Sequence, residues 1–342
     1  MTLTAALAIL GALVLCAVIA QGAWAARRAS PRRPDETAES GRREPSMASA
    51  VEPTLDAEPQ PLPLAPRRIG ARLDPLIDAI APIALEAPVS GELALAHLPP
   101  SRRAGTKPFL IEGLSAETGD WELPAPGQRY GEFQAGVQMA NRGGALNEIE
   151  FSEFVQKLEG FAEGVGGRVE LPDMIDVVAR ARELDAFASS HDAQLAVTLR
   201  ANSAAWSVGY IQQCAARRGF IAGALPGRLV LPAPDEGEPP LLVLGFDPQA
   251  ALAEDPQIAA VRTVTLSLDV PQTAESAEPF PAWHAAARTL CADMDATPID
   301  DQDRPVTLHA FAAIGTDLGA LYRALEARDL AAGSPVARRL FS

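Results

Sequence analysis

The side chains that most often bind metal ions lie far apart along this 342-residue chain. Asp300, Asp301 and Asp303 are close enough together to suggest a cation loop, but they lack the spacing of an EF-hand and its downstream bidentate glutamate. A solvated turn before the last helix explains them more simply. No histidine has a metal-ligand partner three or four residues away; the four are His97, His191, His284 and His309. We therefore predict no metal site and no cofactor.

The chain also lacks the short motifs that hold a nucleophile or a nucleotide. No GxSxG, no Walker A and no GxGxxG in a strand context occurs. The glycine pairs Gly143-Gly144 and Gly166-Gly167 fit a turn and a helix end better than a phosphate cradle. We expect a protein that is not an enzyme and has no small-molecule substrate. An unrecognised enzyme would need polar groups from both halves of the chain to converge in a cleft.

Charge and cysteine content narrow the class of partner. The net charge is −15. Residues 26–72 contain nine Arg and seven Asp or Glu, a net of +2, so the chain from Leu73 onward carries −17. Nucleic-acid binding requires clustered Lys and Arg, so we predict no nucleic-acid partner. Cys16, Cys214 and Cys291 form no disulfide framework and no CxxC pair, as expected in a reducing compartment.

The N-terminus predicts a membrane anchor. Residues 3–20 are almost unbroken aliphatic sequence, long enough to span a bilayer as a helix. Arg27, Arg28, Arg32 and Arg33 follow this run and should remain cytoplasmic, near anionic lipid headgroups. We expect a single-pass membrane protein with its N-terminus outside and a cytoplasmic body.

A cleaved signal peptide is the alternative, because residues 23–25 (Ala-Trp-Ala) fit a small-x-small cleavage site. The apolar run has no basic residue before it and is longer than a usual signal-peptide core, which favours the anchor. If cleavage occurred, the protein would be an exported periplasmic α+β binding module.

The rest of the chain divides by composition and by an internal repeat. Residues 1–26 form the predicted anchor, and residues 27–70 form a disordered linker with eight prolines and no aromatic residue. Two halves then follow the same plan at a shift of about 129 residues. Each has a strand (73–80 and 193–200), a helix (90–97 and 206–217), a hairpin (108–112 with 121–123, and 228–231 with 241–244), a further strand (133–139 and 261–270), a long amphipathic helix (148–165 and 278–294) and a closing helix (172–188 and 306–327).

This plan predicts the α+β class. Each half reads as a split β-α-β domain, with an antiparallel sheet covered by helices on one face and free on the other. We expect a transmembrane helix followed by two such domains in tandem, at 71–189 and 190–330, and a C-terminal tail at 331–342.

Four short motifs lie along the two halves, namely Gly219-Phe220-Ile221, Val270-Pro271, Asp300-Asp301-Gln302 and, in the first half, residues 162–167 (Ala-Glu-Gly-Val-Gly-Gly). They resemble motifs of the ZipA family, membrane-anchored bacterial cell-division proteins. The resemblance also covers the order of anchor, Pro-rich linker and C-terminal domain, and lies mainly in residues 193–328. The family usually has one such domain, whereas this chain has two predicted ones.

The resemblance implies an adaptor that tethers the tubulin-like protein FtsZ to the inner membrane at the division septum. In the family, the free sheet face of the domain binds the C-terminal peptide of FtsZ in an apolar groove. The outward positions of the matching strands here are Gln194 and the six predicted peptide-binding residues Ala196, Thr198, Val243, Gly245, Thr265 and Ser267. This face is small and polar, so we expect binding to be micromolar or weaker.

Overall fold

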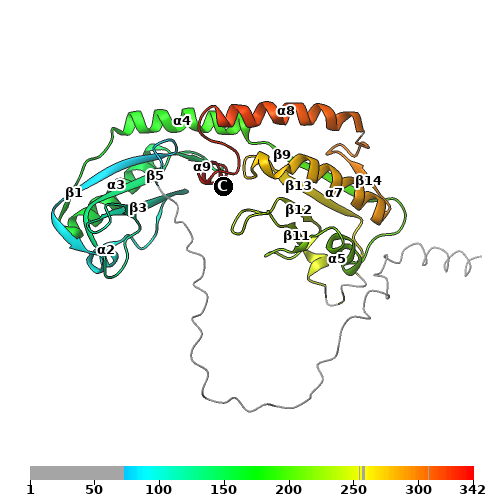
Figure 1. The fold of residues 1–342 in the computed structure, drawn as a ribbon, viewed down its shortest axis with the longest axis horizontal. Coiled ribbons are helices and arrows are strands. Elements are labelled where there is room, and N and C mark those ends of the chain that lie inside the picture. The colour runs from blue at the N-terminus through cyan, green and yellow to red at the C-terminus, as the bar shows by residue number, and fades with distance from the viewer. Residues whose placement is uncertain (1–72, 254, 256–258, 307) are drawn as a thin grey trace, which may run out of the picture. The chain divides into compact units, whose positions relative to one another are not determined.

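The computed structural model describes residues 73–253, 255, 259–306 and 308–342 (Figure 1). The expected anchor (1–26) and the linker (27–70) lie outside this range. Within the described residues, no helix combines the length and apolarity needed to cross a bilayer. These residues form two compact α+β units. Residues 73–192 and Arg328–Ser342 make up the first unit, and Ala193–Ala327 make up the second.

The first unit is an antiparallel sheet with the order β2-β3-β5-β1-β8, and β4 pairs with β3. Its strands are β1 (Asp78–Ser90), β2 (Arg103–Ala104), β3 (Lys107–Ser115), β4 (Trp121–Glu122), β5 (Arg129–Gln138) and β8 (Gly167–Val169). A separate hairpin contains β6 (Ala140–Asn141) and β7 (Gly144–Ala145). The helices are α2 (Gly91–His97), α3 (Glu148–Val165), α4 (Met174–His191) and α9 (Pro335–Leu340).

Aromatic packing joins α3 to this sheet. The ring centroids of Phe109 and Phe154 lie 5.5 Å apart, and those of Phe133 and Phe161 lie 5.3 Å apart, both edge to face. All four side chains are buried. Such pairs add to the free energy gained by burying the apolar area itself. The helical spacing of the apolar residues in 148–165 therefore predicts the core-facing side of α3 correctly.

The second unit is also an antiparallel sheet, with the order β10-β11-β12-β13-β9-β14. Its strands are β9 (Gln194–Ala201), β10 (Ile221–Ala222), β11 (Arg228–Leu231), β12 (Leu242–Gly245), β13 (Thr263–Asp269) and β14 (Ala296–Ile299). The helices are α5 (Val208–Ala216), α6 (Pro248–Ala251), α7 (Pro279–Met294), α8 (Leu308–Glu326) and the 3-10 helix η2 (Glu275–Ala277).

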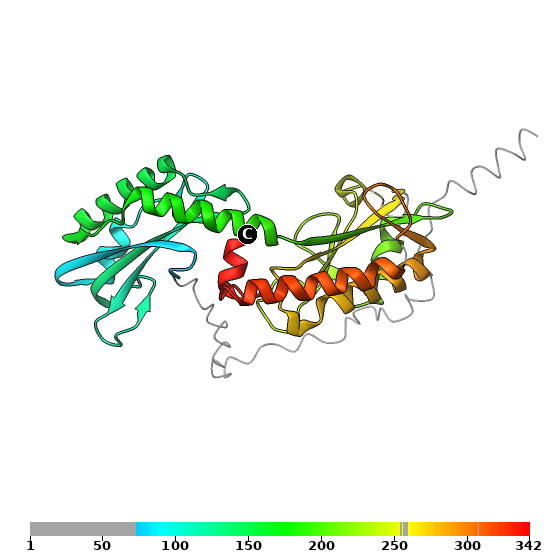
Figure 2. The same cartoon turned by 90° about the horizontal axis from the view of Figure 1, so that it is seen from above.

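Two tryptophans join the helices of the second unit to its core. Trp283 of α7 donates its indole N–H to the carbonyl of Leu266 at 3.1 Å, and Trp206 donates to the carbonyl of Met294 at 2.8 Å. Both rings are buried, so each buried donor has a partner. Figure 2 shows α8 alongside α7.

The strand order β3-β5-β1-β8 of the first unit recurs as β12-β13-β9-β14 in the second. The helices recur in the same places along the chain, with α2, α3 and α4 corresponding to α5, α7 and α8. The duplication predicted from the sequence is therefore present as a common strand order.

The two predicted hairpins, however, are not equivalent in this fold. In the second unit, residues 228–231 and 241–244 give the pair β11 and β12. In the first unit, residues 108–112 lie in β3, which corresponds to β12 because each lies next to the central strand, β5 or β13. Residues 121–122 form β4 on the other side of the hairpin. A hairpin pattern identifies two apolar runs and a turn, but it does not say which run joins the central strands.

The predicted first strand (73–80) is wrong at both ends. It runs from Asp78 to Ser90, and it begins at Asp78 because Asp74 starts a turn. The Asp74 carbonyl accepts the N–H groups of Ile77 and Asp78 at 3.0 and 2.8 Å, and its carboxylate accepts the N–H of Leu76 at 2.9 Å. This is the local competition that aspartate offers to strand pairing.

The expected C-terminal tail (331–342) is also wrong, since these residues belong to the first unit. Leu340 and Phe341 are buried, and Arg339 forms an ion pair with Asp78. The preceding Arg328 lies over the ring of Phe187 at 4.3 Å from its centroid. Arg339 and Asp78 are 261 residues apart in the chain, so no local pattern predicts their contact.

Candidate functional site

The six predicted peptide-binding residues lie together on one face of the second sheet. Directly opposed residues of antiparallel strands share a face. The pairing of β12, β13 and β9 therefore gives two adjacent rows of three, which are Val243-Ser267-Ala196 and Gly245-Thr265-Thr198.

The alternate residues of these strands are buried on the opposite face. Along β13, Val264, Leu266 and Leu268 are buried, whereas Thr265 and Ser267 are half-buried. Helix α7 contacts β9, β13 and β14 and covers the buried face. We call the side that carries the six residues the open face of the second unit.

The hydroxyl groups on the open face already have partners within the sheet. Ser267 donates its hydroxyl to the Val243 carbonyl at 3.3 Å, and the hydroxyl oxygens of Thr198 and Thr265 lie 3.5 Å apart. Ala196 is exposed. The six side chains are short and their hydroxyl groups already have partners. A ligand here would therefore depend largely on contacts outside the six residues.

One end of the open face is hollowed. A cavity of about 350 Å³ lies beside Val243 and Ser267 and extends beyond them by one further row, the cross-strand pair Gln194 and Asp269. We call it the second-unit hollow. Its remaining lining comes from residues that we did not predict as site residues, namely Arg228, Pro239, Pro240, Leu241, Leu242, Leu268 and Gln272.

Charged side chains flank the open face at both ends. Among the described residues, no carboxylate forms an ion pair with Arg228 in the wall of the hollow. At the other end, Arg200 lies 3.5 Å from Asp303. The hollow thus contains one cation, Arg228, and one carboxylate, Asp269.

Asp300 stabilises the turn that follows β14. The Asp300 carboxylate accepts the backbone N–H groups of Gln302 and Arg304 at 2.9 and 2.8 Å and the Arg304 Nε–H at 2.9 Å. The hydrogen bond from the Arg304 backbone lowers the pKa of Asp300. Among the described residues, no group of three or more His, Cys, Asp or Glu side chains is placed to hold a metal ion.

The first unit offers a counterpart for every residue of the open face. Gly166 and Asp295 end α3 and α7 with φ values of 69° and 53°, and the strands β8 and β14 follow them directly. When the two units are aligned on these two positions, the strand pairings match the residues of one sheet to those of the other. The counterparts are Ile80 for Ala196, Pro82 for Thr198, Leu110 for Val243, Glu112 for Gly245, Gln134 for Thr265 and Gly136 for Ser267.

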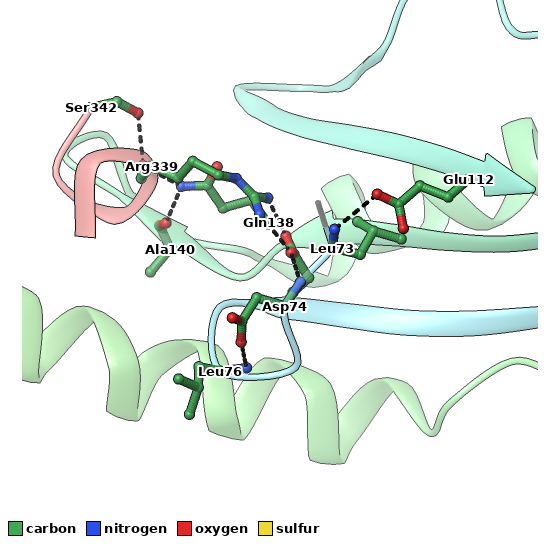
Figure 3. A network of polar contacts seen from close by, with 9 residues as sticks. Leu73, Asp74, Leu76, Glu112, Gln138, Ala140, Arg339 and Ser342 are labelled. Carbon is green, nitrogen blue, oxygen red and sulfur yellow. Dashed lines mark hydrogen bonds and ion pairs between the residues drawn. The ribbon is translucent and has the colours of Figure 1, made fainter. Parts of the chain in front are cut away.

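In the first unit, the chain itself occupies the counterpart of the hollow (Figure 3). The side chain of Leu73 lies against Gly136, where a Cβ atom would come within 2.6 Å of Leu73 Cδ2. The backbone N–H of Leu73 donates to Glu112 at 3.1 Å, and that of Asp74 donates to Asp78 at 2.8 Å.

The C-terminal segment completes this occupied region. The Arg339 guanidinium donates to both carboxylate oxygens of Asp78, at 2.6 and 2.9 Å, and the Asp78 side chain is fully buried. Gln138 donates its amide to the carbonyls of Arg339 and Ala140, each at 2.7 Å. The two units therefore differ in what lies on corresponding parts of their sheets.

The motifs that resemble the ZipA family lie at element boundaries. Gly219 follows α5 with a φ of 85°, Phe220 is buried, and Ile221 begins β10. Val270-Pro271 follows β13, and Asp300 begins the turn after β14.

No protein-family model matches the chain, and no curated protein matches it.

Sequence reasoning found the open face through the alternation of β13, but it missed the hollow. The apolar wall of the hollow comes from Pro239, Pro240 and Leu241, which precede β12 in a loop without periodicity. Asp269 was within the predicted strand 261–270, and only its pairing with Gln194 places it in the cavity wall. A proline pair beside an outward strand position was the one available signal.

Proposed function

We propose that this chain is a cell-division adaptor that tethers FtsZ to the inner membrane and stabilises the division ring. It binds the C-terminal peptide of FtsZ on the open face of the second unit. The adaptor acts by binding alone, without catalysis, cofactor or metal.

The observation that carries the proposal is the hollowed, uncovered face of the second unit. A sheet with helices on one side can present the other side to an extended or helical peptide. In the first unit, Leu73 and Arg339 occupy the corresponding region. Only the second unit therefore has this region available among the described residues, which supports the proposal that the peptide binds there.

The identity of the partner and the place of action come from the sequence. The ZipA-like motifs supply FtsZ as the partner. The apolar residues 3–20 and the arginines after them supply an inner-membrane anchor with lipid contacts, a periplasmic N-terminus and a cytoplasmic body, concentrated at the septum. The short side chains on the face limit the affinity to the micromolar range or weaker. Many anchored copies facing one polymer would compensate through effective concentration.

The test uses the full chain in mild detergent and a fluorescent FtsZ C-terminal peptide, with binding followed by anisotropy. Ala196→Arg and Thr265→Arg should each abolish binding, because a long charged side chain would project from the centre of the face. Pro82→Arg is the matched control, since Pro82 is the exposed counterpart of Thr198 in the first unit and should leave binding unchanged.

Binding that survives both second-unit substitutions, or that is lost only with Pro82→Arg, would contradict the assignment. Localisation tests the alternative of an exported periplasmic binding module. A mature N-terminus near Ala26, or digestion of the body by protease added to intact spheroplasts, would support export and exclude FtsZ as the partner.

A further inference from the structure

The second-unit hollow and its occupied counterpart contain the same pair of polar side chains in exchanged positions. In the first unit, Asp78 of β1 pairs across the sheet with Gln138 of β5. In the second unit, Gln194 of β9 pairs with Asp269 of β13. One carboxylate and one carboxamide therefore stand at the same end of each sheet.

In the first unit, both members of this pair contact Arg339. The carboxylate receives a bidentate guanidinium from Arg339, and the carboxamide donates to the carbonyl of the same residue. One row away, the aliphatic side chain of Leu73 covers Gly136. The first unit thus shows what a filled hollow of this fold contains, namely an aliphatic side chain beside an arginine.

We propose that the second-unit hollow binds a peptide segment with an aliphatic side chain over Ser267 and a basic side chain directed at Asp269. This inference rests on the proposed function only in taking the open face as a peptide site. It adds which side chains of a bound peptide the hollow takes, which the proposed function leaves open.

The walls of the hollow agree with an aliphatic group at its centre. Pro239, Pro240 and Leu241 line one side, and Val243 lies next to Ser267. An aliphatic side chain placed here would exchange water for contact with these apolar groups, which is favourable in proportion to the area buried.

The charges of the hollow orient the segment. Asp269 lies at one wall and attracts the basic side chain, whereas Arg228 at another wall repels it. A guanidinium and a carboxylate also match in geometry, as the two-bond contact of Arg339 with Asp78 illustrates. The ligand therefore binds with its basic residue at the Gln194–Asp269 end.

Ser267 limits how deeply the aliphatic group enters. At Gly136, even a Cβ atom would come within 2.6 Å of Leu73 Cδ2. Ser267 has that Cβ and a hydroxyl, so a leucine cannot take the depth that Leu73 has in the first unit. Removing the Ser267 side chain should therefore improve binding of a segment with an aliphatic side chain.

The probe is a labelled synthetic peptide that copies residues 70–77 (Gly-Ala-Arg-Leu-Asp-Pro-Leu-Ile), in which an arginine precedes the leucine. It is titrated against the full chain in mild detergent. The first unit already contains this leucine within its own chain, so added peptide reports on the second unit. Ser267→Gly should tighten binding at least threefold. Thr263→Gly is the matched control on the same strand and face, outside both the hollow and the six predicted peptide-binding residues, and should leave binding unchanged.

A second measurement tests the charge contact. Asp269→Asn should weaken binding of the probe about tenfold, and Arg72→Ala in the peptide should do the same. Combined, the two changes should weaken binding little more than either alone, because they remove the same contact. A fully additive loss, an absence of probe binding, or an equal response to Ser267→Gly and Thr263→Gly would overturn the inference.

The same variants separate this inference from the proposed partner. If the probe shows the expected pattern and the FtsZ peptide does not bind, the ligand class stands and the partner assignment fails. If the FtsZ peptide binds and is blocked by Thr265→Arg, but neither peptide responds to Ser267→Gly or Asp269→Asn, the adaptor stands and the ligand class is wrong.

Discussion

In the first unit, Leu73 and the guanidinium of Arg339 occupy one end of the sheet face that corresponds to the open face. The corresponding part of the second unit is a hollow of about 350 Å³. The strand order around both places is the same. The difference comes from segments outside the repeated elements, which are the residues before β1 and the last fifteen residues of the chain, Arg328–Ser342.

This comparison shows how one copy of a repeat can become a structural element while the other keeps a surface available for binding. Removing Arg339 would leave the buried carboxylate of Asp78 without its ion-pair partner, so the first unit depends on this occupant for part of its stability. Asp269 is half-buried, so the second unit does not depend on a bound segment in the same way.

Arg339→Ala should destabilise the first unit by about 3 kcal/mol, because it leaves the buried Asp78 carboxylate without its partner. Hydrogen exchange followed by mass spectrometry should show lost protection in β1 and β5 and unchanged protection in β9 and β13. Replacing both partners, by Asp78→Leu with Arg339→Met, should cost much less, because no charge is left buried. Equal loss of protection in both units would show that Arg339 does not act on the first unit alone.

Gly136→Ser should destabilise the first unit by about 2 kcal/mol, because the new Cβ would collide with Leu73. The reverse exchange in the second unit, Ser267→Gly, should cost only about 0.5–1 kcal/mol, the usual effect of glycine within a regular element. Denaturant unfolding gives both values, and the exchange rates of the Leu73 and Asp74 amides should rise in Gly136→Ser alone. Similar costs for the two substitutions would mean that the two sheet ends are not occupied differently.

Alkaline pH should weaken the second unit through Cys291. Burial raises the pKa of this thiol from 9.0 to about 11, so the folded state holds its proton more tightly than the unfolded state does. The stability that this provides is complete below pH 9 and is lost as the pH rises towards 11. At pH 9.5 the loss should be roughly 0.5 kcal/mol, allowing for the partial exposure of the side chain.

The first unit should respond in the opposite direction over this range, because burial lowers the pKa of Lys107 from its ordinary value of 10.5. The unfolded state then binds more protons, and the contribution of Lys107 to stability rises with pH up to about 10.5. Hydrogen exchange at pH 8.0 and 9.5, corrected for the intrinsic rate, should show the two units diverging. Cys291→Ser should remove the loss in the second unit, and a loss unchanged by this substitution would assign it to another group.

Much of the fold follows from local patterns. The alternation of β13 and the helical spacing of the apolar residues in α3 and α7 predict these elements to within one or two residues at most ends. Capping explains the precision at α3, where Asn147 accepts the N–H of Glu150 at 3.0 Å and Gly166 adopts a left-handed conformation at the other end. These signals lie within a few residues of the structure that they specify.

The candidate site was predictable only in part. The six face residues follow from the alternation within β9, β12 and β13, because a period of two decides which side chains share a face. The hollow and its Gln194–Asp269 pair require the register between strands that are far apart in the chain. A loop without periodicity, at 239–241, then decides the depth of the cavity.

The sequence by itself determined the α+β class of the described residues, the internal repeat and the residues of the open face. Each of these follows from patterns of apolar and polar residues that lie within single helices and strands. Only the tertiary structure decided that the face is filled in one unit and hollow in the other. That outcome depends on contacts such as Arg339 with Asp78 and Leu73 with Gly136, between residues separated by 261 and 63 positions. Burial makes such contacts strong or costly, and burial is a property of the folded chain as a whole.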